Sequence, residues 1–261
     1  MLQIRTIIVL LLSLNLFACA WMPEDEDETT GWSASRLYNA AKSAVNASEY
    51  ENAIRYYETL ESRFPFGKYA KQGQIEIAYA YYKYDEPESA IAAADRFIKL
   101  HPNHPHVDYA HYLKGLIYFN REIGLLGRIF QQDSTTRDPS SARKAFEEFT
   151  ALLNKFPKSQ YAGDARLRAL YLRNGLAHHE IHVAGYYLRR QAYNAAINRA
   201  KYVIENFEQS SAVPDALIIM AQAYDELGLT TLATDARRVL QASFPDHDKI
   251  SKKKKSWWNP F

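Results

Sequence analysis

The chain has very little cysteine, with one residue among 261. Because a disulfide needs two cysteines, none can form within this chain. The single residue, Cys19, lies at the end of an apolar stretch near the N-terminus. A lone cysteine in an exported protein can be a free or intermolecular thiol. This position at the end of the stretch favours a modified cysteine instead.

The sequence motifs that mark enzymes are missing as well. We find no glycine-rich phosphate loop, no Gly-x-Ser-x-Gly elbow and no cysteine nucleophile. We therefore predict that the protein is not an enzyme and uses no cofactor. The net charge is only +2, from 32 Lys and Arg against 30 Asp and Glu, so that no overall field attracts nucleic acid. We expect no nucleic-acid partner.

Histidines occur in two groups, within residues 101–111 and 178–182, and raise the question of a metal site. His178 and His182 are four residues apart and share one helix face, which suits two zinc ligands. A closed zinc site needs a third or fourth ligand, and the sequence does not indicate one. The zinc-protease pattern HExxH is broken because Val183 stands where its second histidine would fall. We predict no metal site.

A pattern of small, apolar and aromatic residues recurs five times along the chain. The clearest copy lies between Asp85 and Pro102 and places its residues at i, i+4, i+7 and i+11, which is one face of an α-helix. Because proline disfavours helical geometry in the residue before it, His101 should be the last helical residue. The five copies are Ala53, Tyr57, Leu60 and Phe64; Ala90, Ala94, Phe97 and His101; Ala145, Phe149, Leu152 and Phe156; Ala196, Ala200, Val203 and Phe207; and Ala233, Arg237, Leu240 and Phe244.

This recurrence predicts an all-α fold, a tetratricopeptide-like solenoid of about five helix pairs. Alanine at the start of each face lets a neighbouring helix approach closely, and the ring near its end fills the space where the helices diverge. A single amphipathic bundle helix would not explain five copies in register. We expect the pairs at about residues 33–65, 66–102, 103–157, 158–208 and 209–248.

Two of the five repeats exceed the tetratricopeptide period of about 34 residues. In the third, we expect the extra residues in a loop from Arg121 to Arg137, which is either a binding face or a plain spacer. In the fourth, the pattern from Tyr161 to Tyr187 predicts one long helix.

The N-terminus has the organisation of an export signal. Arg5 precedes an apolar run from Ile7 to Leu16 that is too short to span a bilayer. Residues 16–19, Leu-Phe-Ala-Cys, resemble the lipobox of bacterial lipoproteins. The resemblance implies cleavage after residue 18, with a diacylglycerol on the Cys19 sulfur and an acyl chain such as palmitate on its amino group. The resemblance also favours the outer membrane as the location of the protein, because the residue after Cys19 is not aspartate.

The two ends of the mature chain have unusual compositions. Residues 19–32 contain an acidic run at 24–28 that cannot pack, and we expect them to form a tether. Residues 249–261 combine Lys252 to Lys255 with two tryptophans and a phenylalanine. This tail could contact anionic lipid head groups or an acidic partner. It could equally be a flexible, solvated end.

Five short tracts of the sequence occur in a characteristic order: Arg63 to Gly67, Ala78 to Lys83, Asp95 to Ile98, Asp108-Tyr109 and Arg137 to Pro139. Taken together, they resemble the ComL family of outer membrane assembly lipoproteins. The resemblance implies a lipid-anchored subunit on the periplasmic face of the outer membrane, in the machinery that assembles β-barrel proteins and inserts them into that membrane. The implied partners are the barrel-forming subunit, other assembly lipoproteins and unfolded β-barrel substrates.

The resemblance also implies two binding sites. The amino-terminal repeats would receive substrates, and our candidates are Phe66, Gly67, Tyr79 and Tyr82. Each tyrosine has an alternative role in core packing. Arg199 matches a family arginine that contacts the barrel-forming subunit.

Two other functions fit parts of the sequence. A periplasmic repeat lipoprotein that scaffolds cell-wall or division proteins would have the same composition and periodicity. A competence-linked contact with DNA has only one short basic run in its favour, among otherwise balanced charges.

Overall fold

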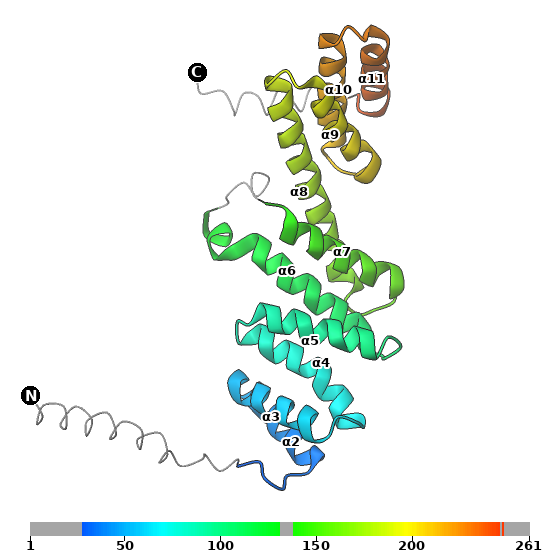
Figure 1. Ribbon diagram of the computed structural model, residues 1–261. Coiled ribbons are helices and arrows are strands. Elements are labelled where there is room, and N and C mark those ends of the chain that lie inside the picture. The colour runs from blue at the N-terminus through cyan, green and yellow to red at the C-terminus, as the bar shows by residue number, and fades with distance from the viewer. Residues whose placement is uncertain (1–27, 131–137, 246, 248–261) are drawn as a thin grey trace, which may run out of the picture.

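The structure is a computed structural model that describes residues 28–130, 138–245 and 247. Within these ranges every regular element is an α-helix, and the helices stack in pairs along one elongated axis (Figure 1). The predicted all-α, tetratricopeptide-like solenoid is thereby confirmed. The first helices of the pairs are α2 (Ala34–Asn46), α4 (Lys68–Lys83), α6 (Val107–Phe130), α8 (Ala162–Arg189) and α10 (Val213–Glu226), and the second helices are α3 (Tyr50–Arg63), α5 (Pro87–Leu100), α7 (Ser140–Lys155), α9 (Tyr193–Asn206) and α11 (Thr230–Ser243).

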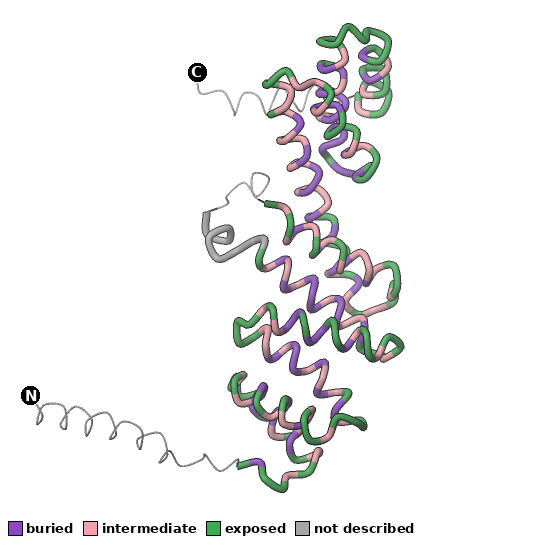
Figure 2. The backbone as a smooth tube through the Cα atoms, in the orientation of Figure 1, coloured by how far each residue is buried: buried purple, intermediate pink, exposed green. Residues whose placement is uncertain are grey.

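The recurring sequence face is the buried face of each second helix. Its first alanine is fully buried in all five copies, and Tyr57, Phe97 and Phe149 are the largest fully buried side chains. The weakest copy departs from this, because Arg237 on α11 is exposed and pairs with Asp225 on α10. The pattern therefore marks the packed side of each second helix, and Figure 2 shows buried residues along the whole stack. Its exposed arginine lies on α11, the last described helix.

All five second helices end in the same way. The backbone N–H of the residue after the helix donates to the carbonyl four residues before it, with φ between −131° and −136°. The fourth copy shares this geometry although Glu208 follows it instead of proline. A proline after the helix is thus not required for this ending. In the second copy α5 ends at Leu100, one residue before the predicted end, with His101 as its cap.

Four of the pairs share one turn between their helices. The central residue of this turn has positive φ at Ser48, Asp85, Gln191 and Gly228. The next N–H donates back to a carbonyl five residues earlier, at 2.8–3.0 Å, which is the Schellman arrangement. In the third pair, the segment between α6 and α7 lies outside the described ranges.

Helix α6 corrects the prediction of a loop from Arg121 to Arg137. The helix runs on to Phe130, so that ten residues of the expected loop are helical, and residues 131–137 lie outside the described ranges. Leucine, isoleucine and arginine favour helix, and single glycines at 124 and 127 do not suffice to stop one. The predicted long helix in the fourth repeat is confirmed, since α8 is continuous from Ala162 to Arg189.

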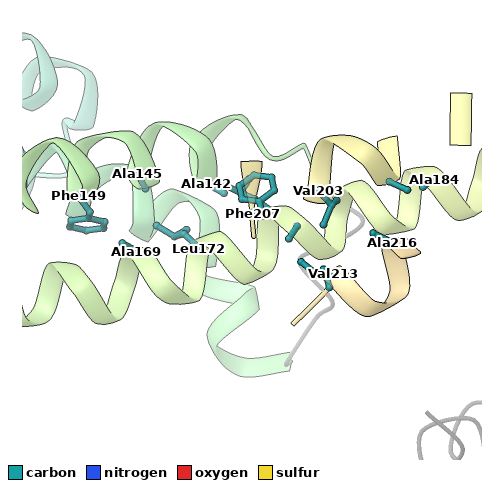
Figure 3. Packing of buried hydrophobic residues seen from close by; sticks show 14 of the residues in the cluster. Ala142, Ala145, Phe149, Ala169, Leu172, Ala184, Val203, Phe207, Val213 and Ala216 are labelled. Carbon is teal, nitrogen blue, oxygen red and sulfur yellow. The ribbon is translucent and has the colours of Figure 1, made fainter. Parts of the chain in front are cut away.

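The buried side chains form two clusters that meet at α6. One joins α2 to α6, and the other joins the end of α6 to α10. Figure 3 shows the second cluster, in which alanines of α7 and α8 let the helix backbones approach around Phe149, Leu172 and Val203. Helix α8 carries one continuous buried side past both α7 and α9.

No helix in the described ranges is long and apolar enough to cross a membrane. Cys19, the signal segment and the tail at 249–261 lie outside those ranges. Their predicted roles therefore stay predictions.

Candidate binding sites

A cavity of about 270 Å³ opens between the first helices of the first three repeats. Its walls come from α2, α3, α4 and α6, together with the residues that directly precede α6 and α8. First helices line the inner surface of repeat arrays, where such proteins bind extended segments. We call this cavity the tyrosine groove. It is lined by Lys42, Val45, Tyr57, Gln72, Ile75, Glu76, Tyr79, His106, Tyr109 and Tyr161.

The floor of the tyrosine groove is organised by the Glu76 carboxylate. It accepts hydrogen bonds from the hydroxyls of Tyr38 (3.0 Å) and Tyr57 (2.6 Å), from Gln72 Nε2 (2.9 Å) and from Lys42 Nζ (2.8 Å). Burial raises the pKa of Glu76, but the donors Lys42, Tyr57 and Gln72 outweigh it, so that the pKa lies below its usual value. Burial and the same carboxylate raise the pKa of Tyr38 to about 12. The floor is thus a fixed, fully paired anion.

Tyr79, Tyr109 and Tyr161 form the wall of the groove above this floor. Tyr109 packs against Tyr161, with ring centroids 5.5 Å apart, and Tyr161 stacks on Tyr112 at 4.7 Å. Tyr112 is held in turn by a 2.8 Å hydrogen bond from its hydroxyl to Asp164 on α8. Among the described residues, the hydroxyl of Tyr79 has no hydrogen-bond partner. The wall therefore offers apolar ring faces and a free hydroxyl to a ligand.

The structure separates the four predicted substrate residues. Both tyrosines pack partly against the core, but only Tyr79 of the two lines the groove, whereas the Tyr82 hydroxyl accepts a hydrogen bond from Asn120. Phe66 is 90% exposed in the loop before α4, outside the groove. Gly67 caps α4 with a φ of +110°, a backbone conformation that favours glycine. The geometry thus supports Tyr79 most directly.

Sequence reasoning missed most of the groove. Gln72, Glu76 and Tyr79 stand at i, i+4 and i+7 on one face of α4, a spacing visible in the sequence. Tyr109 and Tyr161 complete the wall of the groove only because three repeats stack in a particular way. The spacing of residues within one helix does not reveal this stacking.

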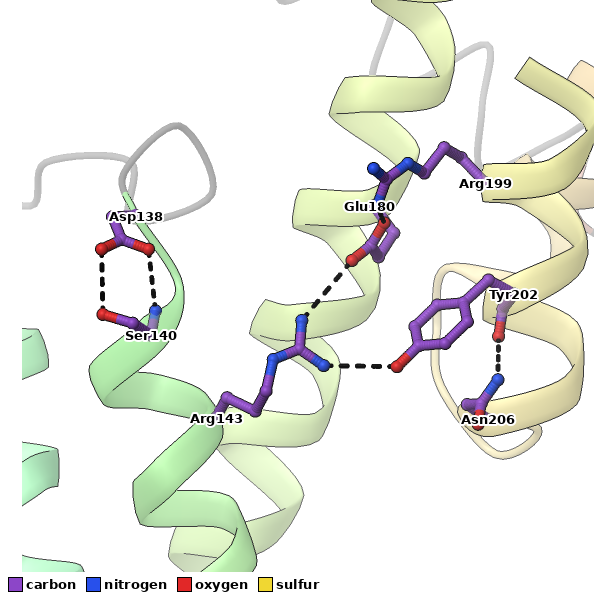
Figure 4. Close-up of polar contacts among 7 residues, drawn as sticks. All are labelled: Asp138, Ser140, Arg143, Glu180, Arg199, Tyr202 and Asn206. Carbon is purple, nitrogen blue, oxygen red and sulfur yellow. Dashed lines mark hydrogen bonds and ion pairs between the residues drawn. The ribbon is translucent and has the colours of Figure 1, made fainter. Parts of the chain in front are cut away.

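Arg199 lies in a second polar cluster, formed where α7, α8 and α9 meet. Its Nη1 donates to Glu180 Oε2 at 3.0 Å. Arg143 on α7 lies 3.7 Å from the other oxygen of the same carboxylate and donates from Nη1 to the Tyr202 hydroxyl at 3.2 Å (Figure 4). Sequence reasoning found Arg199 but neither of the two residues, Glu180 and Arg143, that share this contact.

A third charged cluster joins the second repeat to the third. Lys114 on α6 is buried and pairs with Asp95 on α5 and Glu148 on α7. His111 Nδ1 lies 2.8 Å from the second oxygen of Glu148. Burial raises the pKa of Glu148, but the hydrogen bonds from His111 and Lys114 outweigh this and lower it. Each of the four side chains has a partner within the cluster, whereas the buried Nε2 of His111 has none among the described residues.

The histidines do not assemble into a metal centre in the described part of the chain. No three His, Cys, Asp or Glu side chains gather there in a way that could hold a metal ion. His101 Nε2 instead lies 2.8 Å from Gln74, and His178 Nε2 lies 2.9 Å from Ser211.

Comparison with known proteins places this helical array in a family. Residues 31–240 match the model of the YfiO family, described as outer membrane lipoprotein. The chain belongs to this family. The match confirms the resemblance seen in the short sequence tracts.

Relatives named "outer membrane protein assembly factor BamD" align with nearly the whole chain. The one from Neisseria meningitidis serogroup A is 43% identical over 244 residues, which is 92% of this chain and 91% of the relative. One from Xylella fastidiosa is 35% identical over 251 residues, covering 96% and 86%. One from Vibrio cholerae is 35% identical over 232 residues, covering 88% and 95%. The outer membrane lipoprotein family thus accounts for all five repeats.

Proposed function

We propose that this protein is an outer membrane protein assembly factor, which helps to fold and insert β-barrel proteins and acts by binding instead of catalysis. Membership of the outer membrane lipoprotein family and the names of its relatives support this role. The observation that carries the mechanism is the tyrosine groove, a cavity of about 270 Å³ with a fixed floor. It lies between the amino-terminal repeats, where we expect substrates to bind.

The chemistry of the groove suits the end of a strand-like peptide that carries an aromatic residue. The faces of Tyr79, Tyr109 and Tyr161 can pack against an aromatic ring. The ammonium of Lys42 is half-exposed at the groove and can pair with a peptide carboxylate. The paired Glu76 keeps this geometry in the absence of ligand, which lowers the entropic cost of binding.

Substitution of Tyr79 tests the groove. We expect Tyr79→Ala to weaken binding of a short synthetic peptide with a C-terminal phenylalanine by about tenfold, the effect of losing one good aromatic contact. Tyr84→Ala is the matched control, because Tyr84 is exposed at the end of the same helix and outside the groove. Fluorescence anisotropy of a labelled peptide gives both affinities. Equal affinities for the two variants would show that the groove does not bind the peptide.

Phe66 provides a separate test of the adjoining loop. Its exposed ring could contact a substrate chain as it leaves the groove. We expect Phe66→Ala to weaken binding of an unfolded β-barrel substrate but not of the short peptide. If both lose affinity equally, Phe66 contacts the peptide end itself.

We propose that Arg199 contacts the barrel-forming subunit of the assembly machinery. The guanidinium is 47% exposed on α9 and is available to a partner. Arg199→Glu should prevent co-purification of that subunit from membranes dissolved in mild detergent. Lys201→Glu on the same helix is the control, since Lys201 pairs only with Glu205 among the described residues. Recovery of cell-wall or division enzymes instead of a β-barrel partner would favour the scaffold function.

We propose a lipid anchor at Cys19 and a position on the periplasmic face of the outer membrane. The family description and the sequence around Cys19 support the anchor. Cys19→Ser should release the protein from the outer membrane fraction. Unchanged sedimentation with that membrane would argue against lipidation.

A further inference from the structure

Arg143 and Arg199 approach the same buried carboxylate from opposite sides. Arg199 on α9 contacts Oε2 of Glu180 at 3.0 Å, and Arg143 on α7 lies 3.7 Å from Oε1. The Glu180 side chain is only 5% exposed, whereas those of Arg143 and Arg199 are 40% and 47% exposed. Figure 4 shows the carboxylate between the two guanidinium groups. Three consecutive helices thus build one arginine pair at the surface.

The charge of this cluster is unbalanced. One arginine would neutralise the Glu180 carboxylate. With both arginines, the three side chains together have a net charge of about +1. Each guanidinium has five N–H donors. Among the described residues, Arg199 donates one of them to Glu180, and Arg143 donates one to Tyr202 and approaches Glu180 with another nitrogen. Most of the donors therefore remain available at the surface.

The Tyr202 hydroxyl holds the second terminal nitrogen of Arg143, next to the nitrogen that approaches Glu180. It accepts the Arg143 Nη1–H at 3.2 Å, and the Tyr202 ring packs edge-on against Phe207 with centroids 5.8 Å apart. Phe207 is itself buried in the core. The orientation of Arg143 is thus linked to the packed end of α9.

We propose that Arg143 and Arg199 together bind one carboxylate side chain of a partner protein, and that Glu180 is a positioning residue that sets the spacing of the two guanidinium groups. Arginine pairs with carboxylates through two parallel N–H donors, and a charge-assisted bond of this kind is strong where the site excludes water. The proposal rests on the proposed docking role of Arg199. It adds a second donor, Arg143, and the residues that hold it.

The first experiment examines the arginine pair without the partner subunit. The full chain, labelled with ¹⁵N-arginine, is titrated with a blocked peptide that contains one glutamate, and the Nε–Hε signals are followed by NMR. The signals of Arg143 and Arg199 should shift together with one midpoint, and Glu180→Gln should separate the two midpoints. Shifts no larger than that of the exposed Arg238, or two independent midpoints in the unsubstituted protein, would overturn the proposal.

The second experiment measures affinity for the purified barrel-forming subunit in a double-mutant cycle. Arg143→Lys and Arg199→Lys should each weaken binding by about tenfold, and the double variant by much less than the product, because both contact one carboxylate. Tyr202→Phe should weaken binding by about threefold while leaving all charges in place. Lys144→Ala, next to Arg143 and exposed, is the control and should bind normally.

The outcomes separate this inference from the proposed function. If Arg199→Lys weakens binding but Arg143→Lys and Tyr202→Phe do not, Arg199 keeps its docking role and the arginine pair is wrong. If the unsubstituted chain does not bind the barrel-forming subunit, the proposed partner is wrong. The NMR titration then decides on the arginine pair alone.

Discussion

Gly115 on α6 lies directly against the ring of Phe149 on α7. A Cβ at this position would stand 2.6 Å from Cε1 of that ring, closer than real carbon atoms approach. Phe149 is fully buried, which leaves the ring no free space into which to move. The contact fixes how closely the two helices of the third repeat pack.

This contact predicts that Gly115→Ala destabilises the protein. We expect a loss of about 1–3 kcal/mol from overpacking, in spite of the higher helix propensity of alanine. The control is Gly175→Ala on α8, where a Cβ meets no atom within 4 Å. That change should stabilise by about 0.5–1 kcal/mol. Urea unfolding followed by circular dichroism measures both, and equal effects would contradict the assigned contact.

A glycine should improve the turn between α8 and α9. Gln191 has a φ of +62°, which is unfavourable for a side chain with a Cβ, whereas the equivalent position in the last repeat is Gly228. We expect Gln191→Gly to raise the unfolding free energy by about 0.5 kcal/mol, after the entropy that glycine adds to the unfolded chain. Gly228→Ala should lower it by about 1 kcal/mol. In thermal unfolding, the two variants should change the unfolding free energy in opposite directions. A Gln191→Gly variant that is less stable than the unsubstituted protein would refute the prediction.

The cluster around Glu148 predicts how stability depends on pH in acid. The pKa of Glu148 is lowered in the folded state, from an unfolded value of about 4.3. Its contribution is therefore present above about pH 4.3 and is lost as the pH falls through the lower, folded pKa. The pKa of Lys114 is raised: burial acts to lower it, but hydrogen bonds to Asp95 and Glu148 outweigh burial. The Lys114 contribution is lost only in strong alkali, above about pH 10.4.

The variant Glu148→Gln should therefore be less stable at neutral pH and should lose less stability on acidification. Urea midpoints between about pH 6 and pH 3.5 give the slope. Glu147→Gln is the control, because Glu147 is exposed and makes no ion pair with the described residues. A slope unchanged by Glu148→Gln would show that other carboxylates dominate the acid response.

The floor of the tyrosine groove predicts a difference between two tyrosine hydroxyls. Tyr57 is buried and donates to Glu76 at 2.6 Å, whereas the Tyr81 hydroxyl donates to Glu58 near the surface. Tyr57→Phe should destabilise by about 1–2 kcal/mol, since a buried charged acceptor loses a donor, and Tyr81→Phe by less than about 0.5 kcal/mol. Thermal unfolding of both variants measures the difference. Equal losses would mean that water replaces the Tyr57 hydroxyl.

The sequence predicted the array because each second helix repeats its own packing. A buried alanine and an aromatic residue seven or eleven positions later are local signals, and so is the long apolar pattern of α8. The prediction of a loop after Arg121 was wrong, because the glycines in this segment do not interrupt a helix whose other residues are mostly helix-forming.

The candidate sites were harder to predict because their residues come from different helices. Arg143 and Glu180 lie 37 positions apart in the sequence and meet only through the register of α7 on α8. Tyr79 and Tyr82 look equivalent in the sequence and both pack partly against the core, yet Tyr79 lines the groove and Tyr82 does not. Which face of a first helix is open depends on the neighbouring repeats.

The continuity of α8 gives the protein a fixed internal length. Tyr161, in the wall of the groove, directly precedes the helix, and Glu180 lies within it. At 1.5 Å per residue, the two positions are about 28 Å apart along the helix axis. Because α8 packs against α7 and α9 along its length, bending it would disturb both neighbours. Helix α8 thus holds Tyr161 and Glu180 at a fixed separation. A bound peptide in extended conformation would need about nine residues to reach from one to the other.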